Sequence, residues 1–133
     1  MKFEVTYAAT PAELWRALTD PDELAAWLMP NDFALRLGHK FTFRTRPAPG
    51  FDGIVKCEVL EIEPERRLVY SWNGGGHATI VAWSLEPAGV ATRLTLEHLG
   101  FKGPAALVPR IVLGLGWGRM LRAGMKGRFR RLS

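Results

Sequence analysis

The sequence has very little cysteine, since Cys57 is the only one among 133 residues. An internal disulfide is therefore excluded, and with it a small secreted fold held together by disulfides. The first residues also lack the basic start and apolar stretch of a secretory signal, because polar and apolar residues alternate directly after Met1. We expect a cytoplasmic protein.

Long apolar runs are missing as well. The longest one, residues 105–118, is interrupted by Pro109 and Arg110 and is shorter than the roughly 20 residues that span a bilayer. We therefore expect no transmembrane helix.

Positive charge is in excess, with a formal net charge of +5, but it is unevenly spread. The last fifteen residues carry six cations: Arg119, Arg122, Lys126, Arg128, Arg130 and Arg131. Without this basic tail the chain is close to neutral, and no platform of interleaved basic and aromatic residues indicates a nucleic-acid partner. One explanation of the basic tail is that cations at the end of a helix complement the helix dipole. The alternative is that the tail makes a weak contact with an anionic surface.

Residue groups that carry familiar chemistry are also absent. His39, His77 and His98 are scattered, and Cys57 stands alone, so we expect no metal site. The glycine run 74–76 lacks the Lys-Ser/Thr of a phosphate loop and is typical of a hairpin turn. We expect no cofactor, and the sequence contains no catalytic signature.

Large apolar side chains are abundant, with five Trp and seven Phe and a hydrophobic fraction of 47%. A chain of this length buries about two-thirds of the surface that it exposes when unfolded, which is enough for one core. No repeat or long linker divides the chain, so we expect residues 1–133 to form a single domain.

The order of helices and strands predicts an α+β fold. Thr10-Pro11 and Asp20-Pro21 each place a capping residue before a proline in the first helical turn, which predicts two short helices, the second ending near Trp27. Alternating patterns predict strands at residues 2–8, 40–46, 53–62, 67–73, 77–86 and 91–99. After Pro104 a helical period returns in a long closing helix, which should contain five glycines: Gly114, Gly116, Gly118, Gly124 and Gly127.

The order of several motifs resembles the START-like, or SRPBCC, superfamily, and within it the branch named after activators of heat-shock-protein ATPase homologues. The motifs include residues 11–21 with Leu24 and Trp27, residues 63–68 with Tyr70-Ser71-Trp72, residues 92–98, and Gly116-Trp117. This resemblance implies a helix-grip fold, in which a curved antiparallel sheet of about six strands wraps the closing helix. It also implies a cavity between the two, in a superfamily that binds lipids, polyketides, sterols or hormones and only sometimes catalyses a reaction.

Strand alternation sorts the inward-facing side chains of the predicted sheet. Apolar residues of each strand must face the core, and aromatic and polar residues of the same parity face it with them. The candidate lining of a ligand site is therefore Phe41, Phe43, Tyr70, Trp72, Trp83, His98 and, from the closing helix, Trp117. Our first hypothesis is that these residues enclose a small apolar molecule, with Tyr70 and His98 available for hydrogen bonds.

Other interpretations of the same residues remain. The aromatic side chains can simply fill the core, which is their more frequent role. A cyclase or hydrolase could use His98 or Tyr70 as acid or base. The resemblance also implies a third alternative, a module that modulates a chaperone ATPase through its surface. In each case we expect a monomer or a homodimer.

Overall fold

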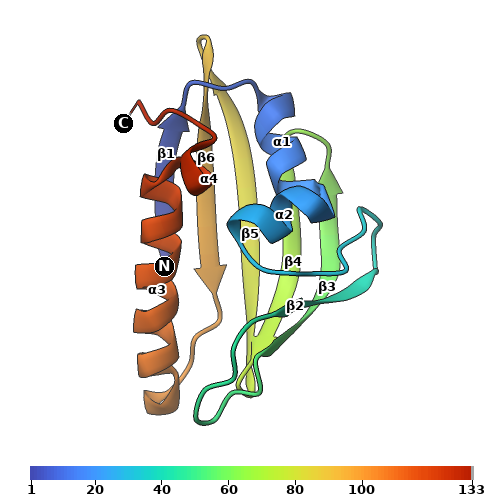
Figure 1. The fold of residues 1–133 in the computed structure, drawn as a ribbon, viewed down its shortest axis with the longest axis vertical. Coiled ribbons are helices and arrows are strands. Elements are labelled where there is room, and N and C mark those ends of the chain that lie inside the picture. The colour runs from blue at the N-terminus through green and yellow to red at the C-terminus, as the bar shows by residue number, and fades with distance from the viewer. Residues whose placement is uncertain (133) are drawn as a thin grey trace.

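One six-stranded antiparallel sheet forms the framework of the protein (Figure 1). The structure, a computed structural model, describes residues 1–132. The strand order across the sheet is β1-β6-β5-β4-β3-β2. The bounds are β1 (Lys2–Tyr7), β2 (Lys40–Arg44), β3 (Ile54–Glu63), β4 (Arg67–Gly74), β5 (His77–Ala88) and β6 (Ala91–Leu99). The predicted sheet is confirmed, with strand ends that differ by one or two residues.

Each strand contributes alternate side chains to one buried face. In β4 the inward residues are Leu68, Tyr70 and Trp72, and in β6 they are Leu94, Leu96 and His98, all at most 3% exposed. The predicted parity is thus correct. The register of β3 and β4 shifts at Leu60, which has no partner opposite it, and such a bulge bends the strand that contains it.

The hairpin between β4 and β5 confirms the predicted glycine turn. Gly75 and Gly76 adopt φ values of 61° and 80°, and Gly74 pairs with His77 across the turn. Two successive residues in the left-handed region are typical of a type I′ turn, which matches the twist of the strands on either side.

Helices α1 (Pro11–Thr19) and α2 (Pro21–Trp27) follow β1 and cover part of the concave face (Figure 1). Thr10 and Glu13 form a reciprocal capping box at the start of α1. The Asp20 side chain accepts hydrogen bonds from the first amides of α2. At the end of α2 the Trp27 ring meets the Trp83 ring edge-on, with centroids 5.9 Å apart.

Helix α3 (Leu107–Arg122) closes the structure after a short 3₁₀ turn, η1 (Pro104–Ala106). It is shorter than predicted. Gly124 and Gly127 lie outside it, in a separate turn labelled α4 (Gly124–Gly127), and Gly124 has a φ of 67°. A glycine in this left-handed conformation terminates a helix, so the expectation that all five glycines lie in one helix is wrong.

The end of the chain returns to β1. The Ala8 amide donates to the Arg130 carbonyl at 2.8 Å, and the Leu132 amide donates to the Thr6 carbonyl at 2.7 Å. The Tyr7 hydroxyl donates to the Leu121 carbonyl at 2.5 Å. These hydrogen bonds hold the C-terminal end of α3 against the sheet.

Candidate ligand-binding site between the sheet and α3

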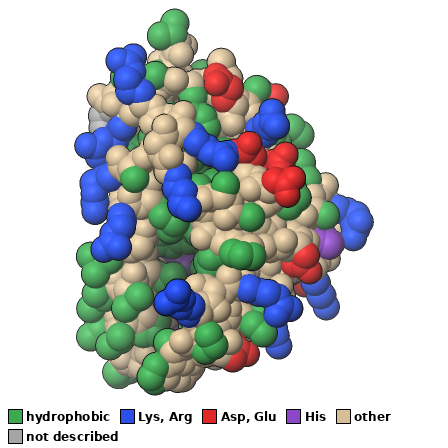
Figure 2. Space-filling view, in the orientation of Figure 1, with side chains coloured by type: hydrophobic (Ala, Val, Ile, Leu, Met, Phe, Trp, Pro, Cys, Tyr) green, Lys and Arg blue, Asp and Glu red, His purple; other side chains and the backbone are tan. Residues whose placement is uncertain are grey.

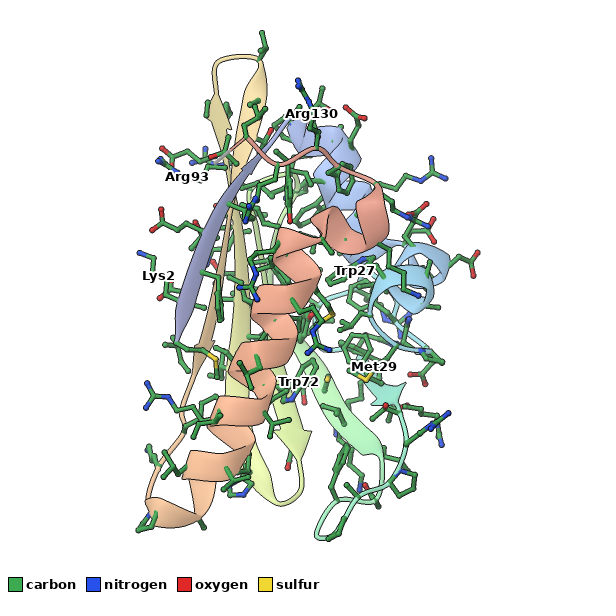
Figure 3. All side chains as sticks on the ribbon, turned by 60° about the vertical axis from the view of Figure 1, so that its left-hand side comes forward. Lys2, Trp27, Met29, Trp72, Arg93 and Arg130 are labelled. Atoms are coloured by element: carbon green, nitrogen blue, oxygen red, sulfur yellow. The ribbon has the colours of Figure 1, made fainter. Side chains whose placement is uncertain are left out.

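The structure brings the seven candidate site residues together. They come from β2, β4, β5, β6 and α3, and ring contacts connect them, with Trp72 pointing toward α3 (Figure 3). Each is at most 3% exposed: Phe41, Phe43, Tyr70, Trp72, Trp83, His98 and Trp117. The candidates chosen from the alternation of side chains along each strand are therefore neighbours in space.

The rings of these residues pack directly on one another. Phe43 and Trp72 have centroids 5.4 Å apart, and Trp72 and Trp117 are separated by the same distance. Trp83 meets Trp117 edge-on at 5.6 Å. These separations are those of favourable aromatic pairs, so in this conformation protein side chains fill the space between sheet and helix.

Two surface hollows of the described chain lie elsewhere. One, of about 430 Å³, is next to the β4–β5 turn and is lined by residues such as Asp52, Lys56 and Asn73. The other, of about 310 Å³, lies between β1 and the first half of α3. Neither is lined by any of the seven candidate residues.

His98 is the centre of a buried chain of hydrogen bonds. Trp117 Nε1 donates to His98 Nδ1 at 3.1 Å, and His98 Nε2 lies 2.8 Å from Thr79 Oγ1. The Thr79 hydroxyl donates to the Trp72 carbonyl at 2.7 Å. Because Nδ1 accepts, the neutral ring carries its hydrogen on Nε2 and donates it to Thr79. This chain connects α3 to three strands.

The surroundings of His98 favour the neutral ring. Burial, and then the positive N-terminus of Met1, lower the pKa of His98 from 6.5 to about 4. The Met1 ammonium donates to the backbone carbonyl of His98 at 2.9 Å, which holds this charge close to the residue. At neutral pH the imidazole is therefore an uncharged hydrogen-bonding group.

Tyr70 and Trp83 form the second polar contact of the site. Trp83 Nε1 donates to the Tyr70 hydroxyl at 2.9 Å, and burial raises the pKa of this phenol. The hydrogen bonds found among residues 1–132 use the Tyr70 oxygen only as an acceptor, which leaves its hydrogen available to a further acceptor.

Two contributors were missed by the sequence interpretation. Thr79 faces inward with Trp83, the candidate residue of β5, but was not predicted as a site residue, although it is the partner of His98. The register pairs Val81 with His98, so Thr79 lies diagonally across from the histidine, and a known register would have found it. The N-terminus of Met1 carries no sequence signal for its role.

Cys57 is buried, 4% exposed, on the inward face of β3. Burial raises the pKa of its thiol, so the thiol stays protonated and behaves as a small apolar side chain. No group of three or more metal-binding side chains lies close together within residues 1–132.

The sequence of this chain is similar to that of a known protein family. The model of the family described as Activator of Hsp90 ATPase homolog 1-like protein matches residues 8–129, which is nearly the whole chain. The chain belongs to this family. The START-like, or SRPBCC, resemblance is thereby confirmed. Among proteins with a curated functional description, none matches.

Solved structures share the complete fold. Protein MLL2253 from Mesorhizobium loti is 30% identical, with a TM-score of 0.82, and the match covers 95% of each chain. CalU16 from Micromonospora echinospora is 26% identical, with a TM-score of 0.77, over 98% of this chain and 68% of that one. DynU16, from the dynemicin biosynthetic locus, is 26% identical with a TM-score of 0.76, and this chain spans about half of its length.

A more distant neighbour shows the fold alone. The Aha1 dimer from Colwellia psychrerythraea is 18% identical, with a TM-score of 0.73, over 96% of this chain. Membership of the family supports a module that binds a ligand or interacts with a partner. No helix in the described part of the chain is long and apolar enough to cross a membrane.

Proposed function

We propose that the protein binds a small apolar ligand between the sheet and α3, with residues 1–133 acting as one binding unit. The observation that carries this proposal is the position of Trp117. Its indole extends from α3 between Trp72 and Trp83 and occupies the centre of the aromatic surface. We infer that Trp117 holds the place of the ligand and leaves it when α3 moves away from the sheet.

The composition of α3 supports such a movement. Gly114, Gly116 and Gly118 lie on either side of Trp117, and a glycine inside a helix costs about 1 kcal/mol relative to alanine. Only one side of α3 is buried, through Trp117, Gly118 and Leu121. A helix with weak internal propensity and a narrow buried stripe bends away from its sheet at its glycines at a low energetic cost, while the Tyr7 to Leu121 hydrogen bond holds its C-terminal end.

The polar groups at and next to Trp117 define the ligand chemistry: His98 contacts its indole, and Tyr70 is hydrogen-bonded to the neighbouring Trp83. When its indole leaves, His98 Nδ1 loses its donor and becomes a free acceptor, while the Tyr70 hydroxyl keeps a hydrogen to donate. An apolar ring system with a hydroxyl directed at His98 and a carbonyl directed at Tyr70 matches this arrangement. DynU16 belongs to a biosynthetic locus, which is consistent with a small-molecule ligand for this fold.

Native mass spectrometry of the protein purified from its host is the first test. We expect an additional mass of a small apolar molecule that disappears after denaturation. A clean mass of the polypeptide alone, together with no binding of the uncharged fluorescent probe N-phenyl-1-naphthylamine, would refute the proposal.

A pair of variants tests the place of binding. Trp117→Phe makes the displaced side chain smaller and removes its hydrogen bond to His98, so we expect the probe to bind roughly three- to tenfold more tightly, from about 1 kcal/mol. Trp15→Phe changes a tryptophan of α1 outside the site and is the matched control. Equal effects of both variants would show that binding follows general stability and not this site.

Gly116→Ala tests the movement of α3. A methyl group at this position meets no atom within 4 Å, so the variant strengthens the helix without touching the core. We expect an increase in unfolding free energy of about 0.5–1 kcal/mol and weaker or slower probe binding. Unchanged probe binding in a stabilised variant would argue against opening at α3.

A further inference from the structure

The outer face of α3 is apolar although it faces solvent. Five aliphatic side chains are between 53% and 68% exposed: Leu107, Val108, Ile111, Val112 and Leu115. At 100° per residue they share one side of the helix, opposite Leu113 and Trp117. We call these five residues the apolar stripe. A helix that is apolar on both sides normally has a second surface packed against it, and a contiguous exposed patch of this kind marks an interaction site.

The charge around the apolar stripe has one sign. After Glu97 the sequence contains no Asp or Glu and eight Lys or Arg, whereas residues 1–97 contain ten Lys or Arg and thirteen Asp or Glu. The net charge is therefore −3 up to Glu97 and +8 beyond it. Within residues 1–132 only Arg128 among these eight cations forms an ion pair, with Glu23.

The cations continue the line of the apolar stripe. Arg119 and Arg122 follow Leu115 at intervals of four and seven residues, so they lie on the same side of α3 one and two turns further on. Figure 2 shows hydrophobic side chains at the lower left, over the first half of α3, and Lys and Arg side chains above them. Acidic side chains gather on the other side of this view.

An open groove runs beside the apolar stripe. It has a volume of about 310 Å³ and lies between Met1 and Phe3 on one side and Ile111 and Leu115 on the other, with Arg110 among its lining residues. An apolar groove with a guanidinium group in its wall suits a hydrocarbon chain that carries an anionic head group.

We propose that the outer face of α3 docks on the surface of a bilayer that contains anionic lipid. The apolar stripe enters the boundary between head groups and acyl chains, and Arg119, Arg122 and the basic tail contact lipid phosphates. Shallow burial of an aliphatic face and attraction of clustered cations are the two contributions that hold a helix flat on such a surface. This inference does not depend on a ligand between sheet and helix.

Charge argues against a second copy of the chain as the occupant. A symmetric contact through α3 brings together two segments that each carry a net charge of +8 and no carboxylate. In an antiparallel arrangement Arg119 and Arg122 of each copy would cover the apolar stripe of the other without an acidic partner. Like charges at an interface oppose association, whereas an anionic bilayer complements both halves of the face.

Co-sedimentation with lipid vesicles tests the proposal. The vesicles are phosphatidylcholine alone and phosphatidylcholine with about one-third phosphatidylglycerol, an anionic fraction that produces a negative surface potential. We expect binding to the anionic vesicles that weakens with added salt, and at least tenfold weaker binding to phosphatidylcholine alone. Equal binding to both compositions, or binding to neither, would overturn the proposal.

Two double variants separate the contributions. Ile111→Gln with Leu115→Gln should weaken binding at least tenfold, and Arg119→Gln with Arg122→Gln should weaken it roughly 25-fold at low salt, about fivefold per cation. All four side chains are exposed, so these variants retain the fold. The matched controls are Val90→Gln, an apolar side chain 99% exposed at the β5–β6 turn, and Arg46→Gln, an exposed cation outside α3.

The outcomes distinguish the possible occupants of this face. Full binding by the Ile111→Gln/Leu115→Gln variant, or equal losses in the controls, would refute docking through the apolar stripe. A dimer in analytical ultracentrifugation that this variant abolishes, with no vesicle binding by the wild type, would assign the face to a second copy instead.

Discussion

His98→Gln probes the hydrogen-bond chain that joins α3 to the sheet. The glutamine amide can accept from Trp117 and donate to Thr79, as the imidazole does, but it does not titrate. The variant therefore separates the pH dependence of this contact from its geometry.

The sign and size of the effect follow from the pKa of His98. Its folded value of about 4 lies below the value of 6.5 that the exposed ring has in the unfolded chain, so between these pH values the unfolded chain binds a proton that the folded chain does not. Protonation would place a hydrogen on Nδ1, opposite the N–H of Trp117. The unfolding free energy is thus highest above pH 6.5 and falls by about 3 kcal/mol as the pH drops to 4.

Urea unfolding at several pH values between 4 and 8 measures this loss. Between pH 8 and pH 4 we expect the wild type to lose about 3 kcal/mol more unfolding free energy than His98→Gln. Carboxyl groups titrate in both proteins and cancel in the difference. His77→Gln removes a histidine outside the hydrogen-bond chain and is the control. Parallel pH profiles of the wild type and His98→Gln would refute the reasoning.

Three further substitutions have defined outcomes in the same unfolding assay. Tyr70→Phe removes the acceptor of the buried Trp83 N–H and should cost about 1–3 kcal/mol, whereas an unchanged midpoint would show that this hydrogen bond contributes nothing. Thr10→Ala removes the cap of α1 and should cost about 1 kcal/mol, an effect that Thr10→Ser should largely rescue. Gly124→Ala places a methyl group against the backbone oxygen of Phe129 at a positive φ, so we expect a loss above 1 kcal/mol, and a stable variant would contradict this turn geometry.

Local patterns in the sequence predicted most of the secondary structure. The alternation in residues 67–73 and 91–99 predicted both the strands and their buried faces, because a strand directs successive side chains to opposite sides. The Thr10-Pro11 and Asp20-Pro21 signals predicted the helix starts, because capping acts within four residues. The end of α3 was predicted wrongly, since a glycine inside a helix and a glycine that ends one look alike until its φ is known.

The candidate site was predicted only as a set of inward-facing residues. The closed packing of the site depends on how deeply Trp117 enters it, and the His98–Thr79 contact depends on the register of the strands. Thr79 and Trp117 each lie 19 positions from His98 in the sequence. No pattern within one strand or helix contains that information.

The sequence by itself determined which residues face the core, where α1 and α2 begin, and that the end of the chain is basic, because these properties follow from local geometry and composition. The tertiary structure alone decided that the aromatic residues fill the space between sheet and α3, and that the apolar stripe of α3 stays uncovered. Burial of a helix face depends on how much surface the rest of the fold offers, and here the sheet covers only the side of α3 that carries Trp117 and Leu121.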